Sequence, residues 1–119
     1  MKELVMITRP ENLEDIKSIL DDVNCGGMTL STVMGCGTQK GMDAELADTV
    51  NEIKGFKITI NLLPKIRVEV VVENKDVESI ITAVREKCAT DRVGDGKIFI
   101  RNIEDVIRIR TGERGAKAM

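Results

Sequence analysis

Two segments with helical periodicity, each lying between strand-like segments, constrain the fold of this chain more than any other feature. In residues 12–24 and again in residues 76–88, apolar side chains recur three or four positions apart, which predicts two helices with one apolar face each. The segments around them are short and rich in β-branched or apolar residues, as is typical of strands; they are residues 2–8, 28–36, 56–73, 97–103 and 106–111. The order βαββαβ, with a short terminal strand, predicts an α+β fold of the ferredoxin-like type, in which two helices cover one face of an antiparallel sheet.

The predicted strand around residues 66–72 bears on the second face of that sheet. One side of this strand carries only apolar residues, which are Ile66, Val68, Val70 and Val72. The other side carries Val71 besides Arg67 and Glu69. Because the strand is apolar on both sides, the face without helices is expected to be covered as well, and we predict self-association through it.

Length and composition indicate one soluble domain spanning residues 1–119. No run approaches the roughly 20 apolar residues that span a bilayer, so we expect no insertion into a membrane. The start of the chain lacks the pattern of a secretory signal, and Cys25, Cys36 and Cys88 have no CxxC spacing. We therefore expect a cytoplasmic protein with reduced thiols.

Composition also excludes several classes of function. The chain has no histidine, so a histidine-based triad, a histidine proton shuttle and imidazole metal ligands are all unavailable. Its net charge is −2 and its only aromatic residues are Phe56 and Phe99. A nucleic-acid surface normally needs a basic face and often stacking rings, so no nucleic-acid partner is expected.

Residues 37–55 form a connection between two strands that a hairpin of two to five residues would join. One interpretation is a surface excursion with a helical turn, because Met42, Leu46, Val50 and Ile53 recur at roughly helical spacing. The other is a long partner-binding loop that orders according to what is bound at its base, with glycines at its hinges. We favour the second interpretation. At the other end of the chain, the tail of residues 112–119 is expected to be mobile.

A candidate phosphate site comes from two separate stretches of the sequence. Gly94, Gly96 and Lys97 offer backbone amides that can approach an anion closely, together with an ammonium group. In the predicted terminal strand, Arg108 and Arg110 are two positions apart and would lie on one face. Two guanidinium groups, an ammonium and glycine amides make a plausible site for a polyphosphate. The alternative is a solvated basic edge paired with Asp or Glu.

The stretches "VGDGKIFI" and "VIRIRTGE", together with "GTQKG" and "LPK" upstream, resemble the PII nitrogen-regulatory signal protein family over nearly the whole chain. This resemblance implies a homotrimer of ferredoxin-like protomers that is not an enzyme and binds ATP or ADP in clefts between neighbours. It implies that ATP with Mg²⁺ and 2-oxoglutarate favours one conformation of residues 37–55 and that ADP favours another. A target protein, either a transporter or an enzyme of nitrogen metabolism, would then meet a different surface in each state.

The resemblance also assigns roles to individual residues. The nucleotide site it implies consists of Ile7, Thr29, Gly37, Thr38, Val71, Val93, Gly94, Asp95, Gly96, Lys97, Arg108 and Arg110. The effector 2-oxoglutarate would be bound by Gln39, Lys40, Gly41 and Lys65. Gln39 would bind Mg²⁺ jointly with the phosphates and the effector, and Lys65 would pair with one of the effector's carboxylates.

This chain departs from the family in its loop. It contains no tyrosine, so the nucleotidylation found in many members is absent, and the loop is longer than usual. Within residues 37–55 the only cations are Lys40 and Lys54, which argues against plugging of an ammonium channel. Thr38 replaces a residue that is often basic, and Asp91 stands where a glycine is common. Two alternatives therefore stay open: a PII-like trimer that senses another small molecule or a metal without 2-oxoglutarate, and a slow ATPase.

Overall fold

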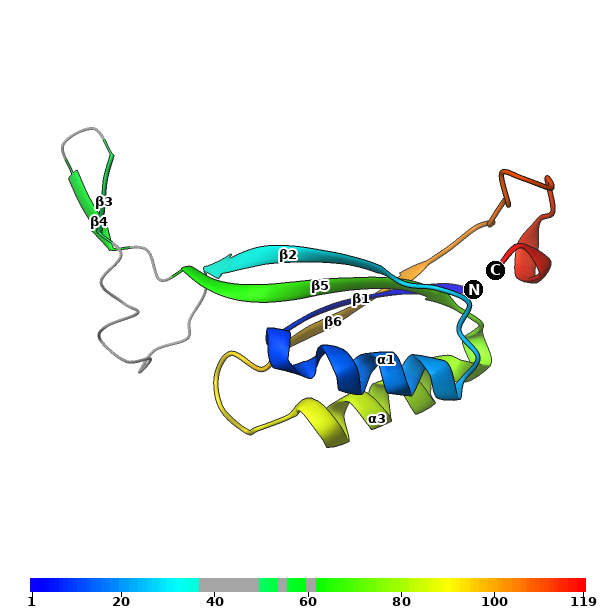
Figure 1. Cartoon of the computed structure of the whole chain (residues 1–119), viewed down its shortest axis with the longest axis horizontal. Helices are drawn as coiled ribbons and strands as arrows, with labels where there is room; N and C mark the ends of the chain where they lie inside the picture. The colour runs from blue at the N-terminus through cyan, green and yellow to red at the C-terminus, as the bar shows by residue number, and fades with distance from the viewer. Residues whose placement is uncertain (37–49, 54–55, 60–61) are drawn as a thin grey trace.

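The computed structural model describes residues 1–36, 50–53, 56–59 and 62–119, with side chains described outside residues 37–61 (Figure 1). Its main elements are β1 (Lys2–Thr8), α1 (Leu13–Asp22), β2 (Thr29–Cys36), β3 (Val50–Ile53), β4 (Phe56–Thr59), β5 (Leu62–Val72), α3 (Val77–Cys88) and β6 (Gly96–Asn102). Short 3-10 turns precede both helices, and a third one, Gly115–Ala118, lies near the end of the chain.

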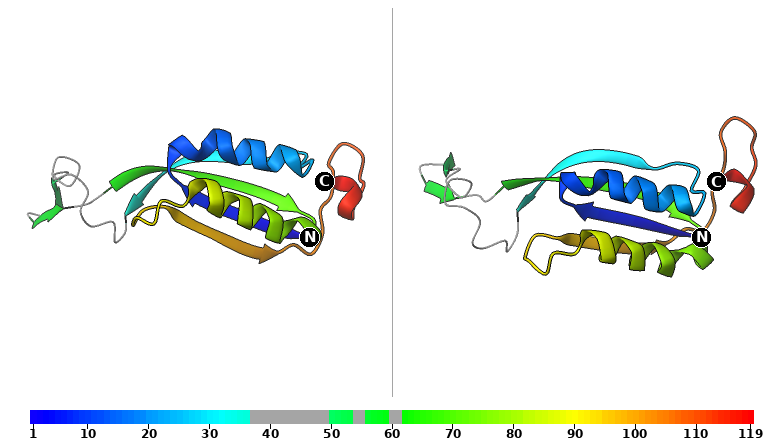
Figure 2. Two further views of the ribbon diagram at one scale, coloured as in Figure 1. Left: turned by 90° about the horizontal axis from the view of Figure 1, so that it is seen from below. Right: turned by 60° about the horizontal axis from the view of Figure 1, so that its bottom comes forward.

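Four strands form one antiparallel sheet in the order β2-β5-β1-β6, and both helices lie on the same face of it (Figure 1, Figure 2). The two central strands, β1 and β5, are far apart in the sequence and are brought together by the two crossovers that carry the helices. This arrangement confirms the predicted α+β fold of the ferredoxin-like type. Among the described residues, no helix combines the length and the apolar character needed to cross a membrane.

The core lies between the sheet and the helices because every second residue of the central strands points toward them. From β1, Leu4 and Met6 are buried in this layer, and Val68 is fully buried beside them on β5. Ile16 of α1 and Ile80 of α3 meet them from the helix side, each with no exposed surface. The apolar stripes predicted from the sequence therefore do form the core.

Neither α1 nor α3 covers the opposite face of the sheet (Figure 1, Figure 2), which mixes apolar with charged side chains. The strand register places Val5 between Glu69 and Phe99, so that these three side chains share this face. The next row along the sheet places Ile7 between Arg67 and Lys97. We call this surface the open face of the sheet. It contains the apolar positions on which the prediction of self-association rests, and that prediction stays untested.

The predicted strand over residues 56–73 is wrong as a single element. Phe56–Thr59 forms β4, which pairs with β3, and β5 begins only at Leu62. Both strands show the same local alternation, so the pattern could not reveal that they have different partners. Val50–Ile53 is a strand, so a helical turn does not extend through Val50 and Ile53. Residues 37–49, 54–55 and 60–61 lie outside the described part of the chain.

The predicted terminal strand over residues 106–111 is also wrong. After Ile107 the chain turns back, and only an isolated antiparallel bridge between Ile107 and Arg114 remains. The turn is closed by hydrogen bonds from the Arg108 amide to the Glu113 carbonyl (2.9 Å) and from the Gly112 amide to the Arg108 carbonyl (2.7 Å). Gly112 has a φ of 74°, which a glycine adopts at little cost. Arg108 and Arg110 are therefore not two neighbours on one face of a strand.

Candidate functional site

The loop between α3 and β6, residues 89–95, lies against the end of β1 and depends on a glycine to do so. Gly96 pairs with Thr8 and has a φ of 106°. A Cβ atom at this position would lie 1.8 Å from the carbonyl oxygen of Ile7, far inside van der Waals contact. Gly94, with a φ of 102°, also adopts a conformation that other residues avoid. The two glycines singled out from the sequence thus set the course of this loop.

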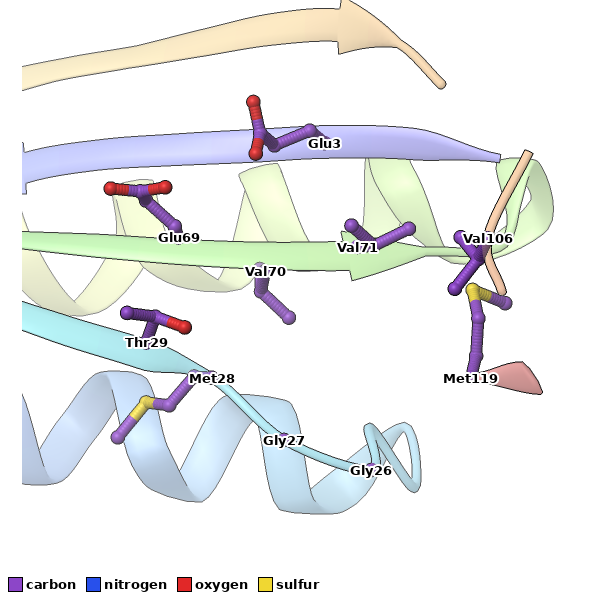
Figure 3. Close-up of a pocket in the computed structure, with 10 residues that line it drawn as sticks. All are labelled: Glu3, Gly26, Gly27, Met28, Thr29, Glu69, Val70, Val71, Val106 and Met119. Carbon is purple, nitrogen blue, oxygen red and sulfur yellow. The ribbon is translucent and has the colours of Figure 1, made fainter. Parts of the chain in front are cut away.

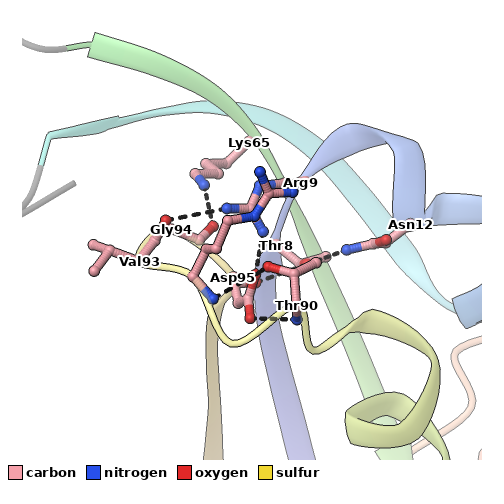
Figure 4. Close-up of polar contacts among 9 residues, drawn as sticks. Thr8, Arg9, Asn12, Lys65, Thr90, Val93, Gly94 and Asp95 are labelled. Atoms are coloured by element: carbon pink, nitrogen blue, oxygen red, sulfur yellow. Dashed lines mark hydrogen bonds and ion pairs between the residues drawn. The ribbon is translucent and has the colours of Figure 1, made fainter. Parts of the chain in front are cut away.

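The carboxylate of Asp95 holds the loop in shape from within (Figure 4). It accepts hydrogen bonds from the backbone amide of Thr90 (2.7 Å), from the hydroxyl of Thr90 and from the guanidinium of Arg9. These bonds, those of Thr90 first, hold the pKa of Asp95 well below its ordinary value. Thr8 ties the backbone of the same residue to β1 by donating from its hydroxyl to the Asp95 carbonyl (3.1 Å). The side chain of Asp95 is therefore engaged inside the loop.

Lys65 of β5 reaches the same loop from the sheet. Its side chain is almost entirely buried, and its ammonium donates a hydrogen bond to the carbonyl of Gly94 (Figure 4). Burial lowers the pKa of Lys65, and the nearby guanidinium of Arg9 lowers it further. A desolvated ammonium favours an anionic partner, because the low dielectric around it strengthens the attraction.

Between the loop and the sheet lies a pocket of about 420 Å³, which we call the loop pocket. It is lined by Ile7, Gly35, Cys36, Leu63, Lys65, Arg92, Val93, Gly94, Asp95, Gly96 and Lys97. Three of these residues, Lys65, Arg92 and Lys97, are cationic, and Arg9 stands beside Lys65. The chemistry of this pocket is that of an anion site with an apolar wall.

A second pocket, of about 370 Å³, lies at the other end of the sheet, and we call it the terminal pocket (Figure 3). Thr29 of β2 and Val71 of β5 line it together with Val106 and Met119 from the end of the chain. Valine and methionine side chains form its walls, and Thr29, Glu3 and Glu69 add a hydroxyl and two carboxylates, which suits a flat, largely apolar group with a few polar edges.

The two pockets lie at opposite ends of one protomer. Lys97 is near the start of β6 and Asn102 is its last residue, about 17 Å further along the strand. The segment after β6, which contains Arg108 and Arg110, lies on the side of the molecule where the C-terminus lies (Figure 1), and Arg108 donates a hydrogen bond to the backbone oxygen of Met119. The expected convergence of Lys97 with these two arginines is therefore not present within a single chain.

The structure sorts the predicted site residues into groups. In the loop pocket it brings together Ile7, Lys65, Val93, Gly94, Asp95, Gly96 and Lys97. In the terminal pocket it places Thr29 and Val71, with Arg108 hydrogen-bonded to Met119 at its edge. Arg110 is exposed in the turn after Ile107 and lines neither pocket. The other predicted residues, Gly37, Thr38, Gln39, Lys40 and Gly41, lie outside the described part of the chain.

Sequence reasoning missed the residues that support the loop, namely Thr8, Arg9, Asn12, Thr90 and Arg92. Asn12 donates to the Thr8 hydroxyl (2.8 Å), and Arg9 also donates to the Val93 carbonyl (3.1 Å). The sequence offered only a weak signal for Arg9, namely a cation that directly follows a buried strand and precedes a proline. What gives Arg9 its role is the pairing of β1 with β6, which places the loop beside it.

Comparison with known proteins gives a consistent result over the full chain. The family model described as nitrogen regulatory protein P-II matches residues 1–113. Nitrogen regulatory protein P-II 2 of Methanothermobacter thermautotrophicus is 42% identical over 119 residues, which cover 100% of this chain and 97% of that protein. The nitrogen regulatory proteins P-II of Rhizobium meliloti and Azospirillum brasilense are 41% and 40% identical, and each alignment covers 100% of both chains.

Proposed function

Because the chain belongs to the nitrogen regulatory protein P-II family, we propose that it is a cytoplasmic signal protein that binds ATP or ADP and thereby changes its contacts with a target of nitrogen metabolism. The observation that carries this proposal is the loop pocket. Glycine amides, a buried ammonium and further cations meet there on an apolar wall, as a nucleotide phosphate chain requires.

The separation of the two pockets supports a homotrimer as the binding unit. The loop pocket and the terminal pocket lie at opposite ends of the same sheet, so one protomer alone cannot place Arg108 beside Lys97. When protomers pack through their open faces, the loop pocket of one chain meets the terminal pocket of a neighbour. The nucleotide then lies in the cleft between chains, with its phosphates on Gly94, Gly96 and Lys97 and its base against Thr29 and Val71.

The proposed effector is 2-oxoglutarate, bound at Lys65. A dianionic keto acid matches an ammonium that is already desolvated and has a second cation, Arg9, beside it. The cationic lining of the loop pocket fits the phosphates and the effector, whereas the proposed Mg²⁺ ligand, Gln39, lies outside the described residues. Mg²⁺, when bound, would neutralise phosphate charge and join the nucleotide to the effector.

The proposed signalling depends on the position of the connection that contains residues 37–55, because both of its ends lie at the loop pocket. Gly35 and Cys36, the last residues of β2, and Leu63, near the start of β5, line the loop pocket. A ligand in this pocket therefore touches both ends of the connection that contains residues 37–55. A tenfold preference of the target for one ligand state corresponds to about 1.4 kcal/mol, which one charge-assisted hydrogen bond can provide. No bond in the nucleotide needs to break.

Calorimetry with ATP, Mg²⁺ and 2-oxoglutarate tests the proposal, together with light scattering to measure the oligomeric state. We expect a trimer that binds ATP and, in the presence of Mg²⁺, binds 2-oxoglutarate only together with ATP. A variant carrying Arg108→Ala and Arg110→Ala should lose ATP binding. The matched control carries Lys17→Ala and Lys87→Ala, which remove the same charge from the helices. Equal ATP binding by the two double variants, or no ATP binding by the wild type, would refute the proposal.

The target is tested by capture from cell extract with the protein as bait. We expect a transporter or an enzyme of nitrogen metabolism to be retained differently in ATP with 2-oxoglutarate than in ADP. A target retained equally in both conditions would contradict nucleotide-dependent signalling.

A further inference from the structure

The end of the chain, residues 106–119, folds back on itself and is held by several polar contacts. We call these residues the C-terminal segment. The guanidinium of Arg114 forms an ion pair with Asp105 (2.7 Å), and the amide of Gly115 donates to the same carboxylate (3.1 Å). The Gly115 amide also donates to the carbonyl of Val106 (2.9 Å). These contacts give the C-terminal segment a defined path back toward the sheet.

This path brings Met119 to the wall of the terminal pocket. Its side chain lines the pocket beside Val106 and near Val71, across from Thr29 (Figure 3). Its backbone passes Gly26 so closely that a Cβ atom there would lie 3.7 Å from the Met119 carbonyl carbon. The last residue of the chain therefore forms part of the wall of the space that the proposed function gives to the base of the nucleotide.

The folded-back C-terminal segment also supplies hydrogen-bond acceptors to the guanidinium of Arg108. One of its nitrogens donates to the carboxylate of Glu113 (3.2 Å) and the other to the backbone oxygen of Met119 (3.3 Å). Glu113 is only five residues away and is presented by the turn that the Arg108 and Gly112 amides close. The carboxylate thus takes the place on Arg108 that the proposed function gives to a phosphate.

We propose that the C-terminal segment is a built-in competitor for the nucleotide. Glu113 holds Arg108 in place of a phosphate, and the backbone oxygen of Met119 accepts from a second nitrogen of the same guanidinium. This inference rests on the proposed function, because it concerns the same binding site. Nucleotide binding then requires that the nucleotide displace both contacts. The measured affinity equals the affinity of the open site multiplied by the fraction of molecules in which the segment is displaced.

The Arg108–Glu113 pair is more than a third exposed on average, so its expected effect is moderate. Ion pairs of this exposure correspond to about a two- to fivefold change in an equilibrium. Glu113→Gln, which removes the charge and keeps the shape, should bind ATP tighter by this factor. Glu104→Gln is the matched control, because Glu104 is an exposed carboxylate near the segment that does not contact Arg108.

Calorimetric titration of the trimeric protein with ATP separates the outcomes. If the wild type binds ATP and Glu113→Gln binds no tighter than Glu104→Gln, the competitor is refuted while the proposed function stands. Weaker binding by Glu113→Gln would show that Glu113 orients Arg108 for the phosphate, which also overturns the inference. If none of the proteins binds ATP, the proposed function fails and the inference fails with it.

Hydrogen exchange gives a second measurement that does not depend on the variants. The backbone amides of Gly112 and Gly115 donate hydrogen bonds within the C-terminal segment. Addition of ATP to the wild type should speed their exchange, because the segment leaves its position. Slower exchange would mean that the segment closes over the bound nucleotide, and the inference would be wrong.

Discussion

Replacement of Gly96 by alanine should be among the most destabilising single changes in this protein. The new Cβ would lie 1.8 Å from the carbonyl oxygen of Ile7 and 2.8 Å from its carbonyl carbon. Both atoms belong to β1, which is paired on both sides, so they cannot move away without breaking hydrogen bonds to β5 or β6. A left-handed backbone costs alanine about 1–2 kcal/mol, and a forced overlap adds about 1–3 kcal/mol. We expect the free energy of unfolding to fall by about 3 kcal/mol.

Two other glycines separate the contributions. Gly112 has a φ of 74°, and a Cβ atom added there would meet nothing within 4 Å, so Gly112→Ala tests backbone strain alone and should cost about 1–2 kcal/mol. Gly27 has an open position and no positive φ, so Gly27→Ala should change stability by less than about 0.5 kcal/mol. Urea unfolding followed by far-ultraviolet circular dichroism suits a chain without Trp or Tyr, at one protomer concentration for all variants. If Gly96→Ala lost no more stability than Gly112→Ala, the close approach of β6 to β1 would be refuted.

Three further predictions concern the loop over residues 89–95 and the loop pocket beside it. Asp95→Asn should lower the free energy of unfolding at pH 7 by about 1–3 kcal/mol, because it weakens charge-assisted bonds to Thr90 and Arg9. Since the folded-state pKa of Asp95 is lowered, the stabilisation from its carboxylate is complete above the unfolded pKa of about 3.9 and is lost as the pH falls further. In urea unfolding, the difference in stability between the wild type and Asp95→Asn should therefore be smaller at pH 3 than at pH 7. An equal difference at both pH values would contradict the assignment. Asp91 has a φ of 61°, so Asp91→Gly should raise the free energy of unfolding by about 0.5 kcal/mol. A lower stability of this variant in urea would argue against backbone strain at Asp91. Lys65→Met should abolish the dependence of ATP affinity on 2-oxoglutarate in calorimetry, and a retained dependence would exclude Lys65 as the effector's partner.

The parts of the fold that could be predicted are those that local periodicity specifies. The predicted helices over 12–24 and 76–88 correspond to α1 and α3, and the strand over 2–8 corresponds to β1. The face of β5 that carries Ile66, Val68, Val70 and Val72 does turn toward the helices. A burial pattern of this kind reflects which side of one element faces apolar surroundings, and that is visible in a single stretch of sequence.

The errors arose where a segment's partner decides its structure. "VIRIRT" alternates as a strand does, yet within the described part of the chain no strand pairs with residues 106–111, and the chain turns back after Ile107. Phe56–Thr59 and Leu62–Val72 read as one strand, but the first pairs with β3 and the second with β1 and β2. A strand exists only when hydrogen bonds to a neighbour form, and the neighbour is not encoded in the strand's own alternation.

By itself, the sequence determined the order of the two helices and the four strands of the main sheet, the helix-facing side of that sheet, the glycines of the loop and the family to which the chain belongs. Only the tertiary structure decided which charged groups meet. The register of β1 with β6 and β5 brings Arg9 to Asp95 and Lys65 to the carbonyl of Gly94, and it leaves Arg108 at the far end with Glu113. The physical reason is that contact between side chains distant in sequence depends on strand register and chain reversal, which are set by the packing of the whole domain.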